Sequence, residues 1–511
     1  MSRISNSVKN FKFGTVGYFI SYLGNFVTRK IFVMYLTVEY LGLNGLFSNI
    51  LSLLSFAELG IGTAICFSLY KPLAFNEIDK IQALMQLFRK AYTTIGLLIL
   101  GIGLSLIPLL PSILGEVPEI PHINFIYSLF VINSGISYFL GYKRTLLIAD
   151  QKKYLDTTYY YGFQVVKYVL QVIVLVFTNN YILFLSVMLF TTVVENLVIS
   201  QKANKIYPFL LEKGKKTLDR DEKLKIQKNV FALIFHKLGS VVISGTDNIL
   251  MVKFVNLASA GINSNYVMIT SALNSVLGIA YNSISASVGN LVVENQLQKS
   301  KSIFDELYFV SAWLVGFSSI CLLILLNSFI SLWLGTVYLF EPKIVFVIVI
   351  NFYLYGMLRP VRTFHSSMGL FWYDRYKPVI ESLINLGASI YLAQKIGLVG
   401  ILIGTAISTI TTCFWFEPYV LFRFGLKLPV REYFYKYILY TLVTIVIGWI
   451  TYGIVNSVSI KNGYLDFLIS MVLCAVVPNS IYLLTYYRSR DFGHVKREMI
   501  HVFQHMKKRG K

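Results

Sequence analysis

The sequence predicts an all-α membrane protein that crosses the bilayer about fourteen times, and three observations lead to this prediction. Of the 511 residues, 56% are hydrophobic and only 14% are charged, which is more apolar surface than a soluble domain can bury. Apolar runs recur along the whole chain at lengths near the roughly 20 residues that a spanning helix needs. The basic residues gather in alternate connecting segments, as they do in polytopic membrane proteins.

The predicted spans are α-helices, because a backbone exposed to lipid must satisfy its own hydrogen bonds. They lie at residues 13–36, 43–69, 86–111, 123–142, 159–178, 181–200, 229–254, 262–290, 305–329, 344–367, 379–394, 397–421, 435–456 and 464–487. The close pair on either side of Lys395 is open to a second interpretation, a re-entrant hairpin, which leaves the orientation of every other span unchanged.

The distribution of charge gives the orientation. If both termini are cytoplasmic, most of the 46 lysines and arginines fall on the inner side, and the outer loops contain only Lys343, Lys395 and Lys461. The net charge of +21 is concentrated in the inner loop 201–228 and the tail 488–511. These segments are predicted to attract anionic membrane lipids, with a solvated charge run as the alternative. Nucleic acid is not a predicted partner.

The cysteines give no sign of a disulfide, a metal or a cofactor. Cys66, Cys321, Cys413 and Cys474 all lie within apolar runs and show no metal-ligand spacing.

The chain contains a weak internal repeat. A shift of 219 positions aligns Gly42-Leu-Asn with Gly261-Ile-Asn, and a shift of 218 aligns Arg144-Thr with Arg362-Thr. Each copy has six spans, an even number, so both copies start on the cytoplasmic side. They are therefore predicted to be parallel repeats related by an axis along the membrane normal. Transporters are often built this way, with the substrate site between the halves. The predicted parts are an N-terminal bundle 1–200, a basic linker 201–228, a C-terminal bundle 229–421, two further helices within 422–487, and a basic tail 488–511.

The tenth predicted span contains two arginines. Asn351, Tyr355, Arg359, Arg362 and Ser366 share one helical face, and Pro360 is expected to kink the span. An arginine at bilayer depth costs at least about 2.5 kcal/mol and marks a ligand path. In the alternative interpretation, both side chains snorkel to the interface.

The first span has a similar polar face. It is formed by Ser21, Asn25, Thr28 and Arg29, with Lys30 adjacent. By helix rise Arg29 lies toward the outer half of the membrane and Arg359 toward the inner half. Cations at two depths are suited to passing an anion across.

The acids Glu58 and Asp247 are the notable carboxylates within spans. Asp247 and Asn248 lie on the seventh span with Lys237 nearby. A carboxylate in low dielectric either takes up a proton or pairs with a cation. These positions are therefore proton or sodium coupling candidates, and a packing ion pair with Arg29, Lys30 or Lys237 is the equal alternative. Glu195, Glu381 and Glu417 are expected to be interfacial.

Several motifs carry a resemblance over nearly the whole length. They are Leu41-Gly-Leu-Asn-Gly-Leu-Phe47, Glu58-Leu-Gly-Ile-Gly62, Leu69-Tyr-Lys-Pro-Leu-Ala74, Trp333-Leu-Gly335, Gly369-Leu-Phe-Trp-Tyr-Asp-Arg-Tyr-Lys-Pro378, and the glycine-rich run Ile396–Ser408. In their order and spacing they resemble the multidrug/oligosaccharidyl-lipid/polysaccharide (MOP) exporter superfamily, and most of all its polysaccharide transporter branch, the Wzx-type flippases.

The resemblance implies two six-helix bundles around a central cavity, two extra helices, and alternating access in a bacterial cytoplasmic membrane. It implies that an undecaprenyl-pyrophosphate-linked oligosaccharide is the substrate, with a polysaccharide polymerase and glycosyltransferases as partners. The expected substrate-binding residues are Asn25, Arg29, Lys30, Lys237, Arg359 and Arg362, because guanidinium groups grip phosphate oxygens. An acid on the seventh helix serves cation coupling in relatives, which assigns that role to Asp247.

Two other functions remain as alternatives. A multidrug exporter of the same fold is the closer one, although cationic drugs should prefer an acidic cavity. The other is a polyprenyl-dependent glycosyltransferase or polymerase, for which Asp219-Arg-Asp221 has the metal-binding DxD form without a nucleotide-binding domain around it.

Overall fold

Helix is the only regular secondary structure in the part of the chain that the computed structural model describes. The described residues are 3–58, 61–114, 120–212, 218, 224, 245–293, 297–458, 463–489, 491–493 and 496–497. They form two units, Met1–Ser264 and Asn265–Lys511. Lys237, the Asp219-Arg-Asp221 motif and most of the seventh predicted span lie outside the described residues.

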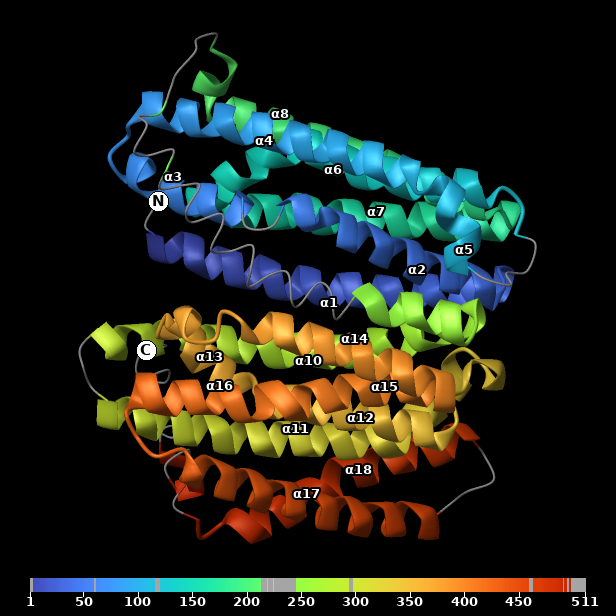
Figure 1. Ribbon diagram of the computed structural model, residues 1–511, viewed down its shortest axis with the longest axis vertical. Helices are drawn as coiled ribbons and strands as arrows, with labels where there is room; N and C mark the ends of the chain where they lie inside the picture. The colour runs from blue at the N-terminus through green and yellow to red at the C-terminus, as the bar shows by residue number, and fades with distance from the viewer. Residues whose placement is uncertain are drawn as a thin grey trace, which may run out of the picture. The chain divides into compact units, whose positions relative to one another are not determined.

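Unit 1 consists of long helices that run side by side (Figure 1). Its elements are α1 (Arg3–Tyr35), α2 (Val38–Leu54), η1 (Ser55–Glu58), α3 (Ile61–Ala74), α4 (Ile78–Ser105), η2 (Ile107–Leu109), α5 (Leu110–Leu114), α6 (Ile123–Ala149), α7 (Lys153–Thr178), α8 (Tyr181–Ile206) and η3 (Pro208–Leu211). Residues 245–254 are helical, as predicted for the end of the seventh span, and the first residues of α10 complete the unit.

Unit 2 is also a helical bundle (Figure 1). Its elements are α10 (Leu257–Val293), α11 (Leu297–Trp333), η4 (Thr336–Tyr338), α12 (Pro342–Met357), α13 (Arg359–Ser367), η5 (Leu370–Trp372), α14 (Lys377–Ile396), α15 (Leu398–Ser408), the π-helix η6 (Thr409–Cys413), α16 (Phe414–Val420), the π-helix η7 (Leu421–Leu426), α17 (Arg431–Ser457) and α18 (Gly463–Tyr486). The boundary at Ser264 falls within α10, so the predicted domain limits stay a prediction.

The predicted spans coincide with helix wherever the structure describes them. Eight of the described helices are long and apolar enough to cross a membrane, or nine if the bent pair Ile123–Phe139 and Gly141–Ala149 is one span. The chain is therefore a multi-pass membrane protein. Within the predicted span 43–69, α2 ends at Leu54 and α3 begins at Ile61, so the segment is not one continuous α-helix. Near Pro360, where a kink is expected, α12 ends at Met357 and α13 begins at Arg359.

The two units repeat the same packing scheme. In unit 1, α4 packs against α6, α6 against α8, and α7 against α8. In unit 2 the helices in the corresponding positions, α11, α12, α14 and α15, pack in the same three pairs. Each unit therefore has the internal neighbours that the sequence repeat predicts.

Small residues bring α14 and α15 close together. A Cβ on Gly400 would lie 2.3 Å from the carbonyl oxygen of Leu392, and one on Gly404 would lie 2.2 Å from Oγ of Ser389. Only glycine fits at these two crossings, because a real Cβ does not approach other atoms so closely. The glycines of the run Ile396–Ser408 thus allow α14 and α15 to pack closely.

Aromatic side chains join the last two helices to unit 2. Tyr308 of α11 stacks on Tyr433 of α17, with ring centroids 5.0 Å apart, and Trp313 stacks on Tyr482 of α18 at 5.6 Å. Trp313 also donates a hydrogen bond of 2.8 Å to Asn479. The packing of α17 and α18 on α11 positions them as an addition to the repeated core.

Candidate substrate-binding and coupling sites

Arg359 lies at the start of α13, where the tenth span breaks. Its guanidinium donates to the carbonyl oxygen of Asn274 on α10. The charge lies over the ring of Tyr281, 5.3 Å from the centroid, and over that of Tyr355 at 5.9 Å. Gly278 leaves room for this arrangement, since a Cβ there would lie 3.2 Å from an Arg359 nitrogen. A backbone carbonyl and two aromatic faces therefore hold Arg359 in place.

The surroundings of Arg359 leave its positive charge uncompensated. Within the described residues its partners are a carbonyl and two rings, and none is a carboxylate. The side chain is only partly exposed, and a cation in such a place is stabilised by an anion that binds there. Tyr355, on the same helical face, is 45% exposed, so its ring is accessible beside the cation.

Arg362, one turn further along, is in a different situation. Its Nε donates to Oε2 of Glu417 at 2.8 Å, and Lys377 also contacts that carboxylate. Glu381 lies 3.5 Å from Lys377 and completes a group of two acids and two bases. The charge of Arg362 is neutralised within unit 2. A role in binding substrate stays a prediction for this residue.

Glu417 is buried. It is 4% exposed and lies on α16, between the two π-helices of the twelfth span. Arg362 and Lys377 supply the two cations that a buried carboxylate needs, and its interfacial depth stays a prediction. The sequence signal that was available is the repeat, which pairs Arg362 with Arg144.

Unit 1 contains a matching ion pair. Arg144 of α6 contacts Glu195 of α8 through one nitrogen, and the other lies 3.3 Å from Asp156 of α7. Asn196 accepts a further bond from Arg144 at 3.1 Å. Glu195 is 8% exposed. Each repeat thus joins its fourth helix to its sixth through an ion pair between a half-buried arginine and a buried glutamate.

Arg29 has a neutral partner. Its Nη1 donates to Oγ of Ser264 at the start of α10, 3.0 Å away. The neighbouring side chains of Asn25 and Lys30 are half-buried, and Thr28 is buried. Ser21, on the same face, is hydrogen-bonded to the hydroxyl of Tyr168 at 3.2 Å. The polar face predicted for the first span is therefore packed against α7 and α10 within unit 1.

Glu58 lies at the break between α2 and α3. Its Oε1 accepts a hydrogen bond of 2.6 Å from the hydroxyl of Tyr92 on α4, and the ring of Tyr138 on α6 lies 5.5 Å from the ring of Tyr92. Gly62 faces the same place, since a Cβ there would lie 2.8 Å from the Tyr92 hydroxyl. In the described part of the chain, phenols and not cations surround this carboxylate, which contradicts the ion pairs with Arg29 or Lys30 weighed above.

Asp247 and Asn248 belong to the helical residues 245–254. Both side chains are half-buried. The amide of Asn248 lies next to Gly45 of α2, where a Cβ would be 3.8 Å from Nδ2. Within the described residues no group of three histidine, cysteine or acidic side chains is placed to hold a metal ion.

Comparison with solved structures shows that several transporters share this fold. A lipid II flippase, MurJ, in an inward closed conformation matches with a TM-score of 0.63 over 95% of this chain and 99% of its own, at 14% identity. The chain has the MOP fold. A multidrug resistance MATE family transporter of the MOP superfamily, inward-facing, matches with a TM-score of 0.59 over 84% of this chain and 99% of its own, at 13% identity. A MATE transporter of Vibrio cholerae matches with a TM-score of 0.54 over 83% of this chain and 99% of its own, at 12% identity.

The MOP fold is carried by structure and not by sequence similarity. No family model matches the chain, and no curated protein matches it either. The identities of 12–14% show the common fold and leave the residues of each site to be judged on their own chemistry.

Sequence reasoning identified the charged residues of these sites and missed their partners. Tyr281 and the carbonyl of Asn274 come from a different helix than Arg359, and Tyr92 comes from a different helix than Glu58. No spacing along the chain predicts such contacts.

Proposed function

We propose that this protein is a flippase that moves a lipid-linked oligosaccharide, carried on undecaprenyl pyrophosphate, across a bacterial cytoplasmic membrane by alternating access. The chain would serve the synthesis of a surface polysaccharide, beside glycosyltransferases that build the unit and a polymerase that joins it. Both termini are then cytoplasmic. The lipid II flippase MurJ, which shares the fold, supports a lipid-linked substrate.

One observation carries the proposal. Arg359 keeps an uncompensated charge inside a membrane span, over Tyr281 and beside the accessible ring of Tyr355. A guanidinium binds phosphate oxygens in a bidentate manner, and an aromatic face is suited to stack on a sugar. Arg29, which donates a hydrogen bond to the neutral side chain of Ser264, gives unit 1 a cation of its own.

A multidrug exporter is the second candidate, because MATE transporters share the fold. Such a protein should offer carboxylates to cationic drugs. Within the described residues, the buried acid Glu195 forms an ion pair with Arg144. The buried acid Glu417 forms ion pairs with Arg362 and Lys377. The remaining charge at the proposed binding positions is positive, which favours an anionic substrate.

Reconstitution into vesicles separates the two functions. The full chain is placed in vesicles that contain undecaprenyl-pyrophosphate oligosaccharide, and a glycosidase that cannot cross the bilayer measures the fraction that reaches the outer leaflet. Ethidium is the cationic drug probe in parallel vesicles. We expect translocation of the lipid and no transport of ethidium. Transport of ethidium without lipid translocation would establish the exporter instead.

Ion coupling is assigned to Glu58, with Asp247 and Asn248 as further candidates. Tyr92 donates a hydrogen bond to Glu58, and within the described residues no cation pairs with this carboxylate. Glu58 also lies at a helix break, and such breaks line cavities or ion sites in transporters. Taking up and releasing a proton there would alter the contacts between the ends of α2 and α3 and the tyrosines.

A further inference from the structure

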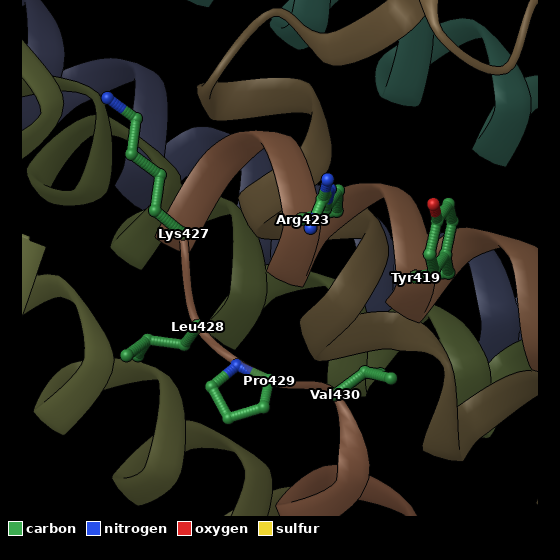
Figure 2. Close-up of a pocket in the computed structure, with 6 residues that line it drawn as sticks. All are labelled: Tyr419, Arg423, Lys427, Leu428, Pro429 and Val430. Atoms are coloured by element: carbon green, nitrogen blue, oxygen red, sulfur yellow. The ribbon is translucent and has the colours of Figure 1, made fainter.

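A basic pocket lies where the twelfth span ends and α17 begins. It has a volume of about 440 Å³ and is lined by Tyr419, Arg423, Lys427, Leu428, Pro429 and Val430. Tyr419, Arg423 and Lys427 follow at intervals of four, and Figure 2 shows their polar ends on the same side of the segment. The hydroxyl, the guanidinium and the ammonium thus form a row of hydrogen-bond donors.

The turn that forms the floor of the pocket is fixed. Lys427 has a positive φ of 56°, which ends the helix, and the N–H of Leu428 bonds to the carbonyl oxygen of Phe422 at 2.9 Å. Pro429 and Val430 then lead into α17. The backbone is therefore held by its own hydrogen bond, and the charged side chains are left available to a ligand.

An aromatic and basic segment adjoins this pocket. The ring of Tyr373 stacks on Phe424 of η7, with centroids 4.0 Å apart and planes at 12°. On the same segment the guanidinium of Arg375 lies over Trp372 at 4.0 Å. Trp372 is 70% exposed. Exposed aromatic rings mixed with cations are typical of the zone where a membrane protein meets lipid headgroups.

Within the described residues, the two cations of the pocket form no ion pair with an acidic side chain. Both Arg423 and Lys427 are exposed. They lie at the end of the unit that the charge distribution assigns to the cytoplasm, where anionic lipids attract basic side chains. The simpler interpretation is that they stabilise the C-terminal end of the helix through its dipole, which predicts no preference among lipids.

We propose that this pocket, lined by residues 419–430, binds the phosphate of an anionic membrane phospholipid. Arg423 would clamp the phosphate oxygens, Lys427 would add a second positive charge, and the hydroxyl of Tyr419 would donate a hydrogen bond. Leu428 and the exposed ring of Phe424 would contact the glycerol and the first methylenes of the acyl chains. This binding is independent of the transported substrate.

Native mass spectrometry of the full chain tests the proposal, with dioleoyl phosphatidylglycerol as the anionic probe and phosphatidylcholine as the zwitterionic one. We expect wild-type protein to retain phosphatidylglycerol preferentially. The variant R423Q/K427Q should bind it at least about 25-fold more weakly, since each charge-assisted contact to the phosphate contributes at least about fivefold. Lys205→Gln combined with Arg488→Gln removes two exposed charges at the same predicted end and should change binding less than about threefold.

Three outcomes would overturn the proposal. Equal retention by wild-type and R423Q/K427Q protein would show that the cations only stabilise the helix end. An equal loss in both double variants would show diffuse attraction without a site. Release of the lipid by millimolar inorganic phosphate would show an anion site that takes soluble phosphate.

Further variants control for folding. R423K/K427R keeps both charges and should retain phosphatidylglycerol. Tyr419→Phe removes only the hydroxyl and should weaken binding by about threefold, the size of one hydrogen bond. Thermal unfolding without added lipid should be the same for all these variants, since the substituted side chains are exposed.

Discussion

Gly42 and Gly261, which the sequence repeat pairs with each other, are in direct contact within unit 1. A Cβ on Gly261 would lie 2.8 Å from the backbone nitrogen of Gly42 and 2.5 Å from the carbonyl oxygen of Val38. A Cβ on Gly42 would lie 2.2 Å from the carbonyl oxygen of Leu257. Both glycines are therefore needed where α2 crosses the start of α10, because the neighbouring atoms are backbone.

The glycine crossing predicts a strong effect of one methyl group. Gly261→Ala must push α2 and α10 apart, because the clashing atoms are backbone, and we expect a loss of about 1–3 kcal/mol in stability with reduced translocation. Gly387→Ala is the matched control, since nothing lies within 4 Å of that Cβ. Thermal unfolding in detergent measures both. If the two variants unfold at the same temperature, the crossing is not tight.

Arg359 is expected to be the most sensitive position for transport. Arg359→Gln removes a charge-assisted contact worth about 1.5–3 kcal/mol, so translocation of the lipid-linked oligosaccharide at low substrate should fall about 10- to 100-fold. Arg359→Lys should recover part of it. The proteoliposome assay measures both, with Lys395→Gln as a control that removes an exposed charge from the last turn of α14. Wild-type rates in Arg359→Gln would remove this residue from the substrate path.

Arg362 is expected to behave as a structural residue. Arg362→Gln leaves Glu417 with Lys377 as its cation and should lower stability by about 1.5–3 kcal/mol, the contribution of a hydrogen bond to a charged group. The double variant R362Q/E417Q should be more stable than R362Q alone, because it removes the buried acid as well. A double-mutant cycle of unfolding free energies measures the coupling. Additive effects would contradict the ion pair.

The matching pair in unit 1 should give the same result. Arg144→Gln should destabilise by a similar amount, and Glu195→Gln in the same chain should offset part of the loss, leaving Asp156 without its arginine. The cycle for Arg144 and Glu195 is compared with that for Arg362 and Glu417. A coupling energy near zero in one repeat alone would show that the two pairs are not equivalent.

Glu58 is expected to link transport to protons. Glu58→Gln mimics the protonated acid, so translocation should continue without responding to an imposed proton gradient. Tyr92→Phe removes the hydrogen bond of 2.6 Å and should shift the pH at which transport is half-maximal. Vesicles with separate proton and sodium gradients measure this. A full response to the proton gradient in Glu58→Gln would transfer the role to Asp247.

Patterns along the chain determined the class of the protein and the place of nearly every helix. Apolar runs of spanning length predict membrane helices because lipid leaves the backbone no other way to satisfy its hydrogen bonds. The repeat that pairs Gly42 with Gly261 and Arg144 with Arg362 was also visible, since duplication preserves spacing. These features depend on residues that are close together or regularly spaced along the chain, so the sequence alone was sufficient to predict them.

Tertiary structure decided which charges are balanced. Arg359 and Arg362 look alike in sequence, but Glu417 from another helix neutralises Arg362, and Asn274 and two rings hold Arg359. Glu58 gained tyrosines where cations were considered. The energy of a buried charge depends on the atoms within a few ångströms of it. Helix packing brings those atoms together from distant parts of the chain, so spacing along one helix does not reveal them.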